Sequence, residues 1–499
     1  MKEELTEEII WIRKKNEVYL QVDASPGILR EMQDHFKFRV PGYQFHPAYK
    51  RRQWDGFLRI FNTYDGTLFL GLINRLEEFC KTRNYKVIIE KEVTDRVLAF
   101  TQEDAKNYSL TLKLPFELRE DQLKIIHHCI VNNRALILSP TSSGKSALIY
   151  SLARWYHEKT LIIVPTLDLI SQTYDMFKTY SKDNKFDVEK NMHTIFSGQD
   201  KDSKKQIFLS TWQSIHKMSK KWFDQFNLVI FDEAHTAQAN CIKDIMIKLE
   251  NCKYRFGLTG TLDGSKCHEM VLSGLFGEIF SGSTSSELMK KKVISDLQIN
   301  CLILEYSEAE RKQVKELKYH EEIKFLTLHS KRNKFIKNLA ISMKNNTLVL
   351  FQYIEHGKTL FELIKEELKK TDPKRRVFFI AGEIEKDVRE KVRLLTEKEK
   401  NAIIVASVAI YSTGINIRNL KTLIFASPTK SRIRTLQSIG RTLRIGDESS
   451  EAIMYDIVDD LTYKSHQNFA TTHFLARAKI YKSEKYPFKI KKIILTKDK

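Results

Sequence analysis

Two series of short apolar runs, separated by amphipathic stretches with helical spacing, occupy most of the chain after residue 134. The first series lies at 135–139, 160–165, 206–211, 228–233 and 255–260, and the second at 347–353, 377–382, 402–407, 422–427 and 452–458. Runs of this kind are typical of strands in a mainly parallel sheet that helices cover on both faces. The pattern therefore predicts an α/β fold with two tandem parallel-sheet domains.

The first 105 residues lack this rhythm and are expected to form a small α+β domain. The predicted organisation is a nucleic-acid-binding domain at 1–105, an ATP-binding sheet domain at 106–290, a second sheet domain at 291–470 and a basic C-terminal segment at 471–499. Residues 284–346 are charged and helix-rich, so the boundary between the sheet domains is expected there. The stretch from residue 481 onward is predicted to be a solvated tail rather than a nucleic-acid contact.

The charge balance favours a polyanionic partner. Lysine and arginine exceed aspartate and glutamate by 83 to 63, which gives +20, and either nucleic acid or an anionic membrane surface would satisfy this balance. No apolar segment reaches the roughly 18 residues of a membrane span, and the first ten residues are acidic, unlike a secretory signal. A cytoplasmic protein is expected. The six cysteines form no C-x-x-C pair, so neither a zinc site nor a disulfide framework is predicted.

The segment SPTSSGKS at 139–146 lies where a strand ends and a helix begins, which is the context of a phosphate-binding loop. Its first glycine is replaced by Ser139, so the motif alone would also fit an ordinary turn. Lys145 is predicted to reach the β- and γ-phosphates of ATP, and the Ser146 hydroxyl to bind Mg²⁺. The predicted ATP-binding residues of the loop are Thr141, Ser142, Ser143, Gly144, Lys145 and Ser146.

Two carboxylates follow the predicted strand at 228–231. Asp232 and Glu233 would lie at the carboxyl end of that strand, where open parallel sheets present their ligands. Asp232 is predicted to hold Mg²⁺, and Glu233 to orient the water that attacks the γ-phosphate. His235 would couple the state of the nucleotide to neighbouring elements. Taken alone, such a pair more often caps a helix, but the preceding phosphate loop favours catalysis.

SPTSSGKS, DEAH at 232–235, LTGT at 258–261 and QSIGRTLR at 437–444 together resemble the superfamily 2 helicases, in order and in spacing. The resemblance implies two tandem RecA-like motor domains and ATP hydrolysis between them. It also implies arginine fingers at Arg441 and Arg444, with Gln437 nearby. Positive charge from the second domain would stabilise the charge that develops on the transferred phosphate.

Weaker segments fit the same family pattern. The resemblance implies that Arg119 and Gln122 read adenine, and that Thr259, Thr261 and Gly414 couple the motor domains. It further implies backbone contacts to nucleic acid from Thr166, Thr211 and Thr413. Each of these three hydroxyls could also serve as a helix cap.

More narrowly, the chain resembles the bacteriophage UvsW helicases nearly end to end, through YQFHPAYKRRQWDG at 43–56, FGEIF at 276–280 and SKRNKFI at 330–336. This resemblance implies remodelling of branched DNA, including forks, Holliday junctions and R-loops, in recombination and repair. DNA is therefore the expected partner, with RNA–DNA hybrids as a further substrate. The location would be the host cytoplasm for a phage protein.

An aromatic and basic cluster in the N-terminal domain is predicted to bind DNA through Lys50, Arg51, Arg52, Trp54 and Arg59. The alternative is a solvated hairpin with Trp54 packed inward and a turn at Asp55 and Gly56. Three other functions remain open from sequence, namely a duplex DNA translocase of a restriction-type system, an RNA helicase and a non-enzymatic strand-annealing protein.

Overall fold

The computed structural model describes residues 9–94, 99–140, 143–196, 200–235, 239–262, 264–382, 395, 398–408, 420–427, 431, 439 and 451–495. The chain divides into two compact units. The first comprises 1–139 and 144–282, and the second comprises 140–143 and 283–499. Among the described helices, none has both the length and the apolar content that a membrane crossing requires.

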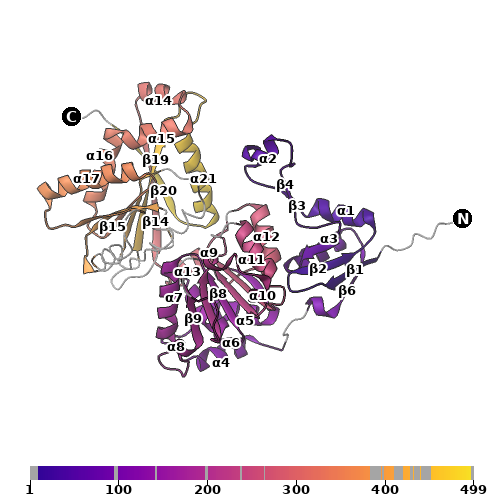
Figure 1. The fold of residues 1–499 in the computed structure, drawn as a ribbon. Coiled ribbons are helices and arrows are strands. Elements are labelled where there is room, and N and C mark those ends of the chain that lie inside the picture. The colour runs from indigo at the N-terminus through magenta and orange to yellow at the C-terminus, as the bar shows by residue number, and fades with distance from the viewer. Residues whose placement is uncertain are drawn as a thin grey trace. The chain divides into compact units, whose positions relative to one another are not determined.

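The N-terminal part of the first unit is a four-stranded mixed sheet in the order β5-β2-β1-β6 (Figure 1). Its strands are β1 (Ile9–Lys14), β2 (Tyr19–Asp23), β5 (Thr67–Phe69) and β6 (Lys86–Ile89), and its main helices are α1 (Pro26–His35) and α3 (Ile73–Thr82). Alternate residues of the strands, such as Ile10 and Ile12 of β1, are buried in the same core as Met32 of α1 and Phe79 of α3. This period of two is what a sheet with one covered face requires.

A short antiparallel pair, β3 (Lys37–Arg39) and β4 (Phe57–Arg59), carries the aromatic and basic segment. Between these strands lie a 3₁₀ turn, η1 (Tyr43–Phe45), and a one-turn helix, α2 (Pro47–Lys50). We call residues 40–56 the β3–β4 excursion. Gly56 adopts φ +83°, a left-handed conformation suited to glycine, where the chain returns to β4.

The first motor sheet has seven strands in the order β13-β7-β12-β11-β8-β10-β9, and all of their pairings are parallel. The strands are β7 (Arg134–Leu138), β8 (Thr160–Val164), β9 (Met192–Ile195), β10 (Ile207–Thr211), β11 (Leu228–Asp232), β12 (Tyr254–Thr259) and β13 (Ile279–Ser281). Helices α5 (Glu120–Asn132), α6 (Lys145–Trp155), α7 (Leu167–Tyr180), α11 (Ala239–Lys248) and α12 (Lys266–Phe276) complete this part. In β11, Val229 and Phe231 enter one core whereas Leu228 and Ile230 enter another, so both faces of the sheet are buried. All five predicted runs are strands of this sheet.

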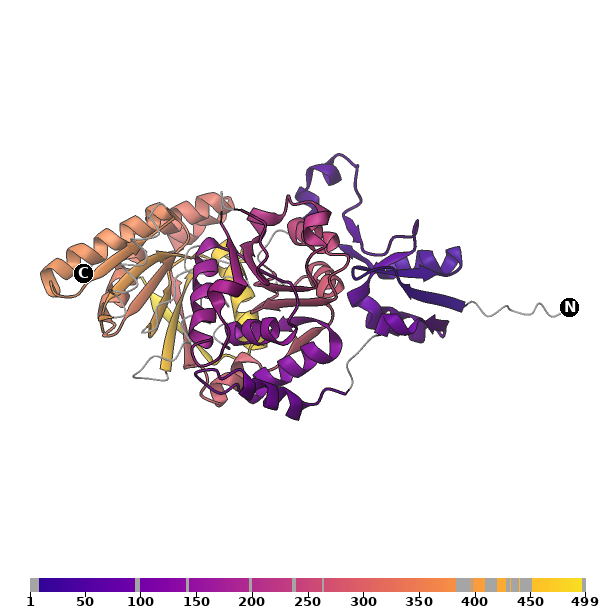
Figure 2. The same ribbon diagram turned by 60° about the horizontal axis from the view of Figure 1, so that its bottom comes forward.

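The N-terminal sheet and the first motor sheet share a hydrophobic core and form one body (Figures 1 and 2). Backbone approaches backbone at Gly71, where an added Cβ would overlap the carbonyl oxygen of Ser273 in α12. A Cβ at Gly274 would lie 2.8 Å from the ring of Phe69. The small domain therefore has its own sheet, but it is packed into the first motor unit rather than set apart from it.

The second unit contains another seven-stranded parallel sheet, in the order β16-β17-β15-β18-β19-β14-β20. Its strands are β14 (Asp296–Glu305), β15 (Thr347–Phe351), β16 (Val377–Ile380), β17 (Ile403–Ser407), β18 (Thr422–Phe425), β19 (Glu451–Asp460) and β20 (Phe488–Ile494). Its described helices are α13 (Ser285–Lys290), α14 (Glu308–Lys315), α15 (Tyr319–Leu328), α16 (Ser330–Ser342), α17 (Ile354–Thr371) and α21 (Phe469–Ser483). The tandem parallel-sheet fold is confirmed.

Two strands of this sheet depart from the sequence-based expectation. The region 284–346 is helix-rich as predicted, with α13 to α16, but it also contains the unpredicted strand β14. β20 lies in the stretch that was predicted to be a solvated tail. β20 pairs in parallel with β14, from Phe488 opposite Ile299 to Ile494 opposite Glu305 (Figure 1). The prediction of a solvated tail was wrong. β20 is an edge strand with exposed lysines, and its sequence therefore resembles that of a solvated segment.

Candidate ATP site

The predicted catalytic residues of the first unit converge at the carboxyl edge of its sheet. β12 lies between β7 and β11, and its residues Leu258 and Thr259 pair with Asp232 and Leu138. The ends of these three strands therefore bring the phosphate loop, the Asp232–Glu233 pair and the LTGT segment together. This is the edge at which parallel sheets bind ligands.

Gly144 shapes the described end of the phosphate loop. It adopts φ +86° as the N-cap of α6, and an added Cβ would lie 2.6 Å from Nε2 of Gln122. The Ser143 hydroxyl donates to the carbonyl oxygen of Pro140 at 2.6 Å, and the side chain of Ser146 is exposed in the first turn of α6. The positive end of an eleven-residue helix thus faces the position expected for the phosphates. Thr141 and Ser142 lie outside the described residues.

Lys145 forms an ion pair with Glu233 across the site. Both side chains are largely buried, with 11% and 18% of their surfaces exposed. Burial opposes ionisation of Glu233, but the charges of Lys145 and then His235 hold its pKa below the ordinary value. Burial raises the pKa of the neighbouring Asp232. Glu233 also has φ +49°, a strained conformation for a non-glycine residue, of a kind that clusters at functional sites.

A short polar chain connects this ion pair to the end of β12. Nδ1 of His235 lies 3.4 Å from Oε2 of Glu233 and within hydrogen-bond distance of the Thr259 hydroxyl. That hydroxyl donates its proton to the carbonyl oxygen of Thr261 at 2.7 Å, so Nδ1 of His235 must carry a proton and donate to Thr259. The Thr261 hydroxyl is buried, and it has no hydrogen-bond partner among the described residues. The structure thus places three of the four predicted coupling residues, His235, Thr259 and Thr261, beside the Glu233 carboxylate.

The predicted adenine-reading residues begin α5. The guanidinium of Arg119 donates to both carboxylate oxygens of Asp121, at 3.0 and 2.9 Å. Gln122 accepts a hydrogen bond from the Arg119 backbone at 3.0 Å and donates to the Gly144 carbonyl at 3.4 Å. Sequence reasoning missed Asp121, which orients Arg119, although it stands within the same LREDQ segment.

Thr166 and Thr211 follow adjacent strands at the same sheet edge. Thr211 is the last residue of β10 and pairs with Val164 of β8, two residues before Thr166. The Thr166 hydroxyl accepts from the backbone of Leu169 at 3.4 Å and so caps α7, whereas the Thr211 hydroxyl lies 3.0 Å from that of Ser214. Their nucleic-acid role remains a prediction. Thr413, Gly414, Gln437, Arg441 and Arg444 lie outside the described residues.

In the β3–β4 excursion, Lys50, Arg51 and Arg52 are exposed, and Arg52 adopts φ +59°. Trp54 is half-buried, and its indole N–H donates to the carbonyl oxygen of Phe57 at 2.8 Å. Arg59 forms an ion pair with Asp55. The three consecutive cations therefore face solvent, while Trp54 and Arg59 are held by contacts within the excursion and β4.

Sequence reasoning missed two further residues of this surface. Phe45 is 78% exposed, which is unusual for so large an apolar side chain. The guanidinium of Arg39 lies over the rings of Tyr43 and Phe57, at 4.6 and 4.3 Å from their centroids. The aromatic residues of the YQF segment at 43–45 could have indicated Phe45, but only the fold determines that this ring is exposed.

Two parallel-sheet units, with a strand-to-helix phosphate loop and the Asp232–Glu233 pair at one sheet edge, are the architecture of the superfamily 2 nucleic-acid motors. Three family models match the chain. They are described as the res subunit of type III restriction enzymes at 115–264, the N-terminal part of the DNA helicase UvsW at 10–90, and a helicase conserved C-terminal domain at 330–446.

The chain is 33% identical over 503 residues to the ATP-dependent DNA helicase uvsW of Enterobacteria phage T4, which covers 96% of this chain and 98% of that protein. It is 25% identical over 406 residues to the DNA 3'-5' translocase XPB2 of Sulfurisphaera tokodaii, covering 75% of this chain and 88% of the relative. The crystal structure of T4 UvsW matches 98% of this chain and 100% of its own, with 32% identity and a TM-score of 0.52. The chain belongs to the UvsW family of helicases.

Proposed function

We propose that the protein is an ATP-dependent DNA helicase that remodels branched DNA, such as forks, Holliday junctions and R-loops, in recombination, repair and replication restart. The observation that carries the enzymatic part is the Lys145–Glu233 ion pair at the carboxyl edge of a motor sheet, in a chain related to a phage DNA helicase along nearly its whole length. The protein would act in the cytoplasm of the host cell.

The residues present fit ATP with Mg²⁺. Gly144 begins α6, whose N-terminus attracts phosphate oxygens, Lys145 supplies the cation, and the Asp232 carboxylate stands at the strand end where a metal would bind. Mg²⁺, when bound through Ser146 and Asp232, would neutralise charge on the phosphates. The ion pair supports a switch, because Lys145 must leave Glu233 in order to reach the phosphates. The released carboxylate can then orient the attacking water.

His235 and Thr259 would transmit the movement of the Glu233 side chain to the end of β12. A close contact between His235 and Glu233, and hydrogen bonds from His235 to Thr259 and from Thr259 to Thr261, connect these groups, so movement of the carboxylate alters contacts at the end of β12. Arg441 and Arg444, with Gln437, would complete the site from the second motor domain during closure. Thr166, Thr211 and Thr413 would hold the phosphate backbone of the DNA strand without reading its sequence.

The preference for branched DNA is assigned to the β3–β4 excursion. Lys50, Arg51 and Arg52 offer three exposed cations beside the exposed ring of Phe45, a combination that suits duplex phosphates next to unpaired bases. Because the N-terminal sheet is packed against α12, a duplex arm bound there would move with the first motor domain.

The test compares ATP hydrolysis and strand separation on single-stranded, forked, four-way and duplex DNA and on RNA. We expect forked and four-way DNA to be unwound with ATP, and to stimulate hydrolysis more than duplex DNA. Stimulation by duplex DNA without strand separation would instead indicate a restriction-type translocase, and stimulation by RNA alone an RNA helicase. Annealing without ATP turnover would indicate the non-enzymatic alternative.

A further inference from the structure

Two aromatic rings are exposed together on the second unit. Tyr319 is the first residue of α15 and Phe469 the first residue of α21, and their side chains are 37% and 38% exposed. The rings meet edge to face with centroids 5.5 Å apart. Residues 150 positions apart in the chain thus form one small aromatic surface, which we call the α15–α21 aromatic pair.

The pair lies at the carboxyl edge of the second sheet. Asn468, the N-cap of α21, accepts from the backbone of Leu461 at 3.1 Å and donates to the carbonyl oxygen of Asp459 at 3.1 Å, which ties α21 to the end of β19. Burial, and then a hydrogen bond with Tyr353, raise the pKa of Tyr319 to about 12. Tyr353 follows the end of β15, so Tyr319 is anchored at the same edge. Ligands of parallel sheets bind at this edge.

A buried carboxylate fixes the two helices relative to each other. Glu322 of α15 is 1% exposed and accepts three N–H groups from the start of α21. These come from the Asn468 side chain at 3.0 Å, the Phe469 backbone at 3.0 Å and the Ala470 backbone at 2.8 Å. The contact sets the position of Phe469 against Tyr319 to within the tolerance of a hydrogen bond.

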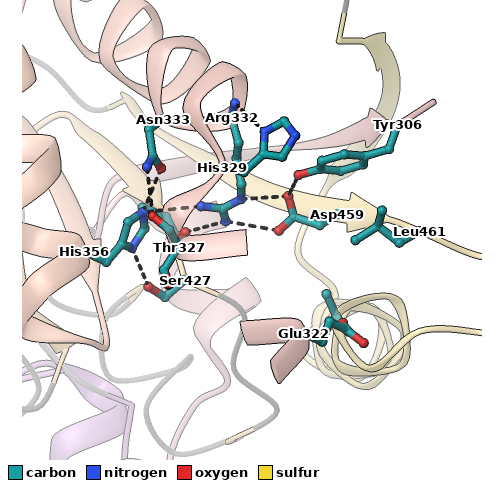
Figure 3. Close-up of polar contacts among 12 residues, drawn as sticks. Tyr306, Glu322, Thr327, His329, Arg332, Asn333, His356, Ser427, Asp459 and Leu461 are labelled. Carbon is teal, nitrogen blue, oxygen red and sulfur yellow. Dashed lines mark hydrogen bonds and ion pairs between the residues drawn. The ribbon is translucent and has the colours of Figure 1, made fainter. Parts of the chain in front are cut away.

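A second buried network of hydrogen bonds holds the ends of β18 and β19. The guanidinium of Arg332 donates to both oxygens of Asp459, at 2.7 and 3.0 Å (Figure 3). It also donates to the carbonyl oxygen of Ala426 at 2.7 Å. The Tyr306 hydroxyl also donates to Asp459, at 2.7 Å. Arg332 and Asp459 are fully buried, and such pairs add little net stability over an apolar core. Their contribution is to define where β18 and β19 end, and hence where α21 begins.

Two exposed lysines lie close to the pair in the chain. Lys318 precedes Tyr319, and Lys464 stands on the loop that leads from β19 to α21. The carboxylate of Glu321 accepts from the backbone of Lys318 at 2.7 Å and is thereby engaged in capping α15. Exposed rings among flexible cations are the combination with which proteins bind unpaired nucleic-acid strands.

We propose that Tyr319 and Phe469 form a stacking platform for the bases of single-stranded DNA on the second motor domain. Stacking on a ring needs no particular base, so this contact suits a motor that does not read sequence. The Glu322 and Arg332 networks hold the platform in place before DNA arrives, which lowers the entropy lost on binding. The platform consists of residues other than those predicted to contact the phosphate backbone and those of the β3–β4 excursion.

The test replaces both rings with leucine in the full-length protein, because Tyr319→Leu/Phe469→Leu keeps an apolar contact between α15 and α21. The probe is an oligothymidylate that carries 2-aminopurine, whose fluorescence falls when the base stacks. We expect the Kd for this strand to rise at least about fivefold and the quenching to be lost. Leu475→Ala shortens an apolar side chain that is 44% exposed on α21 outside the aromatic pair, and it should leave both the Kd and the quenching unchanged.

Wild-type affinity and quenching in the folded double variant would overturn the proposal. If the double variant fails to fold, Tyr319→Trp provides the second test, because a ring is retained at the same place. The emission of this variant, after subtraction of the wild-type chain with its five tryptophans, should be quenched on addition of unlabelled oligothymidylate but not of blunt duplex. Identical emission with and without the single strand would then rule the platform out.

Discussion

Glu17, in the turn between β1 and β2, forms an ion pair with Arg134, the first residue of β7, with 2.9 Å between Oε2 and Nη2. Burial and the nearby Arg255 lower the pKa of Arg134 to about 10, and Glu17 opposes this shift. The side chain of Arg255 is itself fully buried. The N-terminal sheet therefore supplies the counter-charge for a buried cation of the first motor sheet, in addition to its apolar contacts.

Glu17→Ala should destabilise the first unit by about 3 kcal/mol, because it leaves Arg134 buried without its carboxylate. Calorimetric melting of the full chain would show this as a lower Tm. Asp23→Ala provides the control, since its ion pair with Arg13 is about half exposed and should contribute less than about 1 kcal/mol. Equal Tm values for the two variants would contradict the role assigned to Glu17.

A fragment that starts at residue 106 should fold poorly on its own. It would expose the surface of α12 that packs against Phe69 and Gly71, and would leave Arg134 without Glu17. Solubility and size-exclusion chromatography of fragments 106–282 and 1–282 would measure the difference. A monodisperse, cooperatively melting 106–282 fragment would show that the N-terminal sheet is dispensable for the motor fold.

Lys145→Ala should reduce ATP turnover to background while DNA binding persists, because the lysine compensates phosphate charge and no described contact joins it to the predicted DNA-facing threonines. Turnover assays combined with fluorescence anisotropy separate the two functions. Near-wild-type turnover would remove the phosphate-loop assignment.

Glu233→Gln should bind ATP and hydrolyse it at least about 100-fold more slowly, since the amide keeps the shape of the side chain but cannot accept a proton. The variant should accumulate as an ATP-bound complex that filter binding detects. Loss of ATP binding instead would make Glu233 a structural residue and would place the water-orienting role elsewhere.

The triple change Lys50→Ala/Arg51→Ala/Arg52→Ala should weaken binding to four-way DNA and reduce the slope of log Kd against log salt by up to about 3. A matched triple variant, Lys369→Ala/Lys370→Ala/Lys374→Ala, removes equal charge from exposed positions of the second unit. If both variants lose junction affinity equally, the effect is one of net charge, and the β3–β4 excursion does not recognise the branch.

The sequence by itself determined the tandem parallel sheets and the positions of Lys145, Asp232 and Glu233 at the strand ends. Both depend on local patterns, since buried parallel strands appear as apolar runs and their ligands follow directly at the strand ends. Lys145, Asp232 and Glu233 could be assigned on this basis. The strand β20 could not, because an edge strand buries little and its lysines resemble those of a solvated tail.

Only the tertiary structure decided which distant groups meet. It paired Lys145 with Glu233, attached the N-terminal sheet to the first motor sheet through Glu17 and Arg134, and brought Tyr319 beside Phe469. Each of these contacts joins segments that are remote in sequence, and each depends on strand order and helix packing rather than on local propensity. The sequence around a charged or aromatic residue does not reveal whether the fold buries it, pairs it or exposes it.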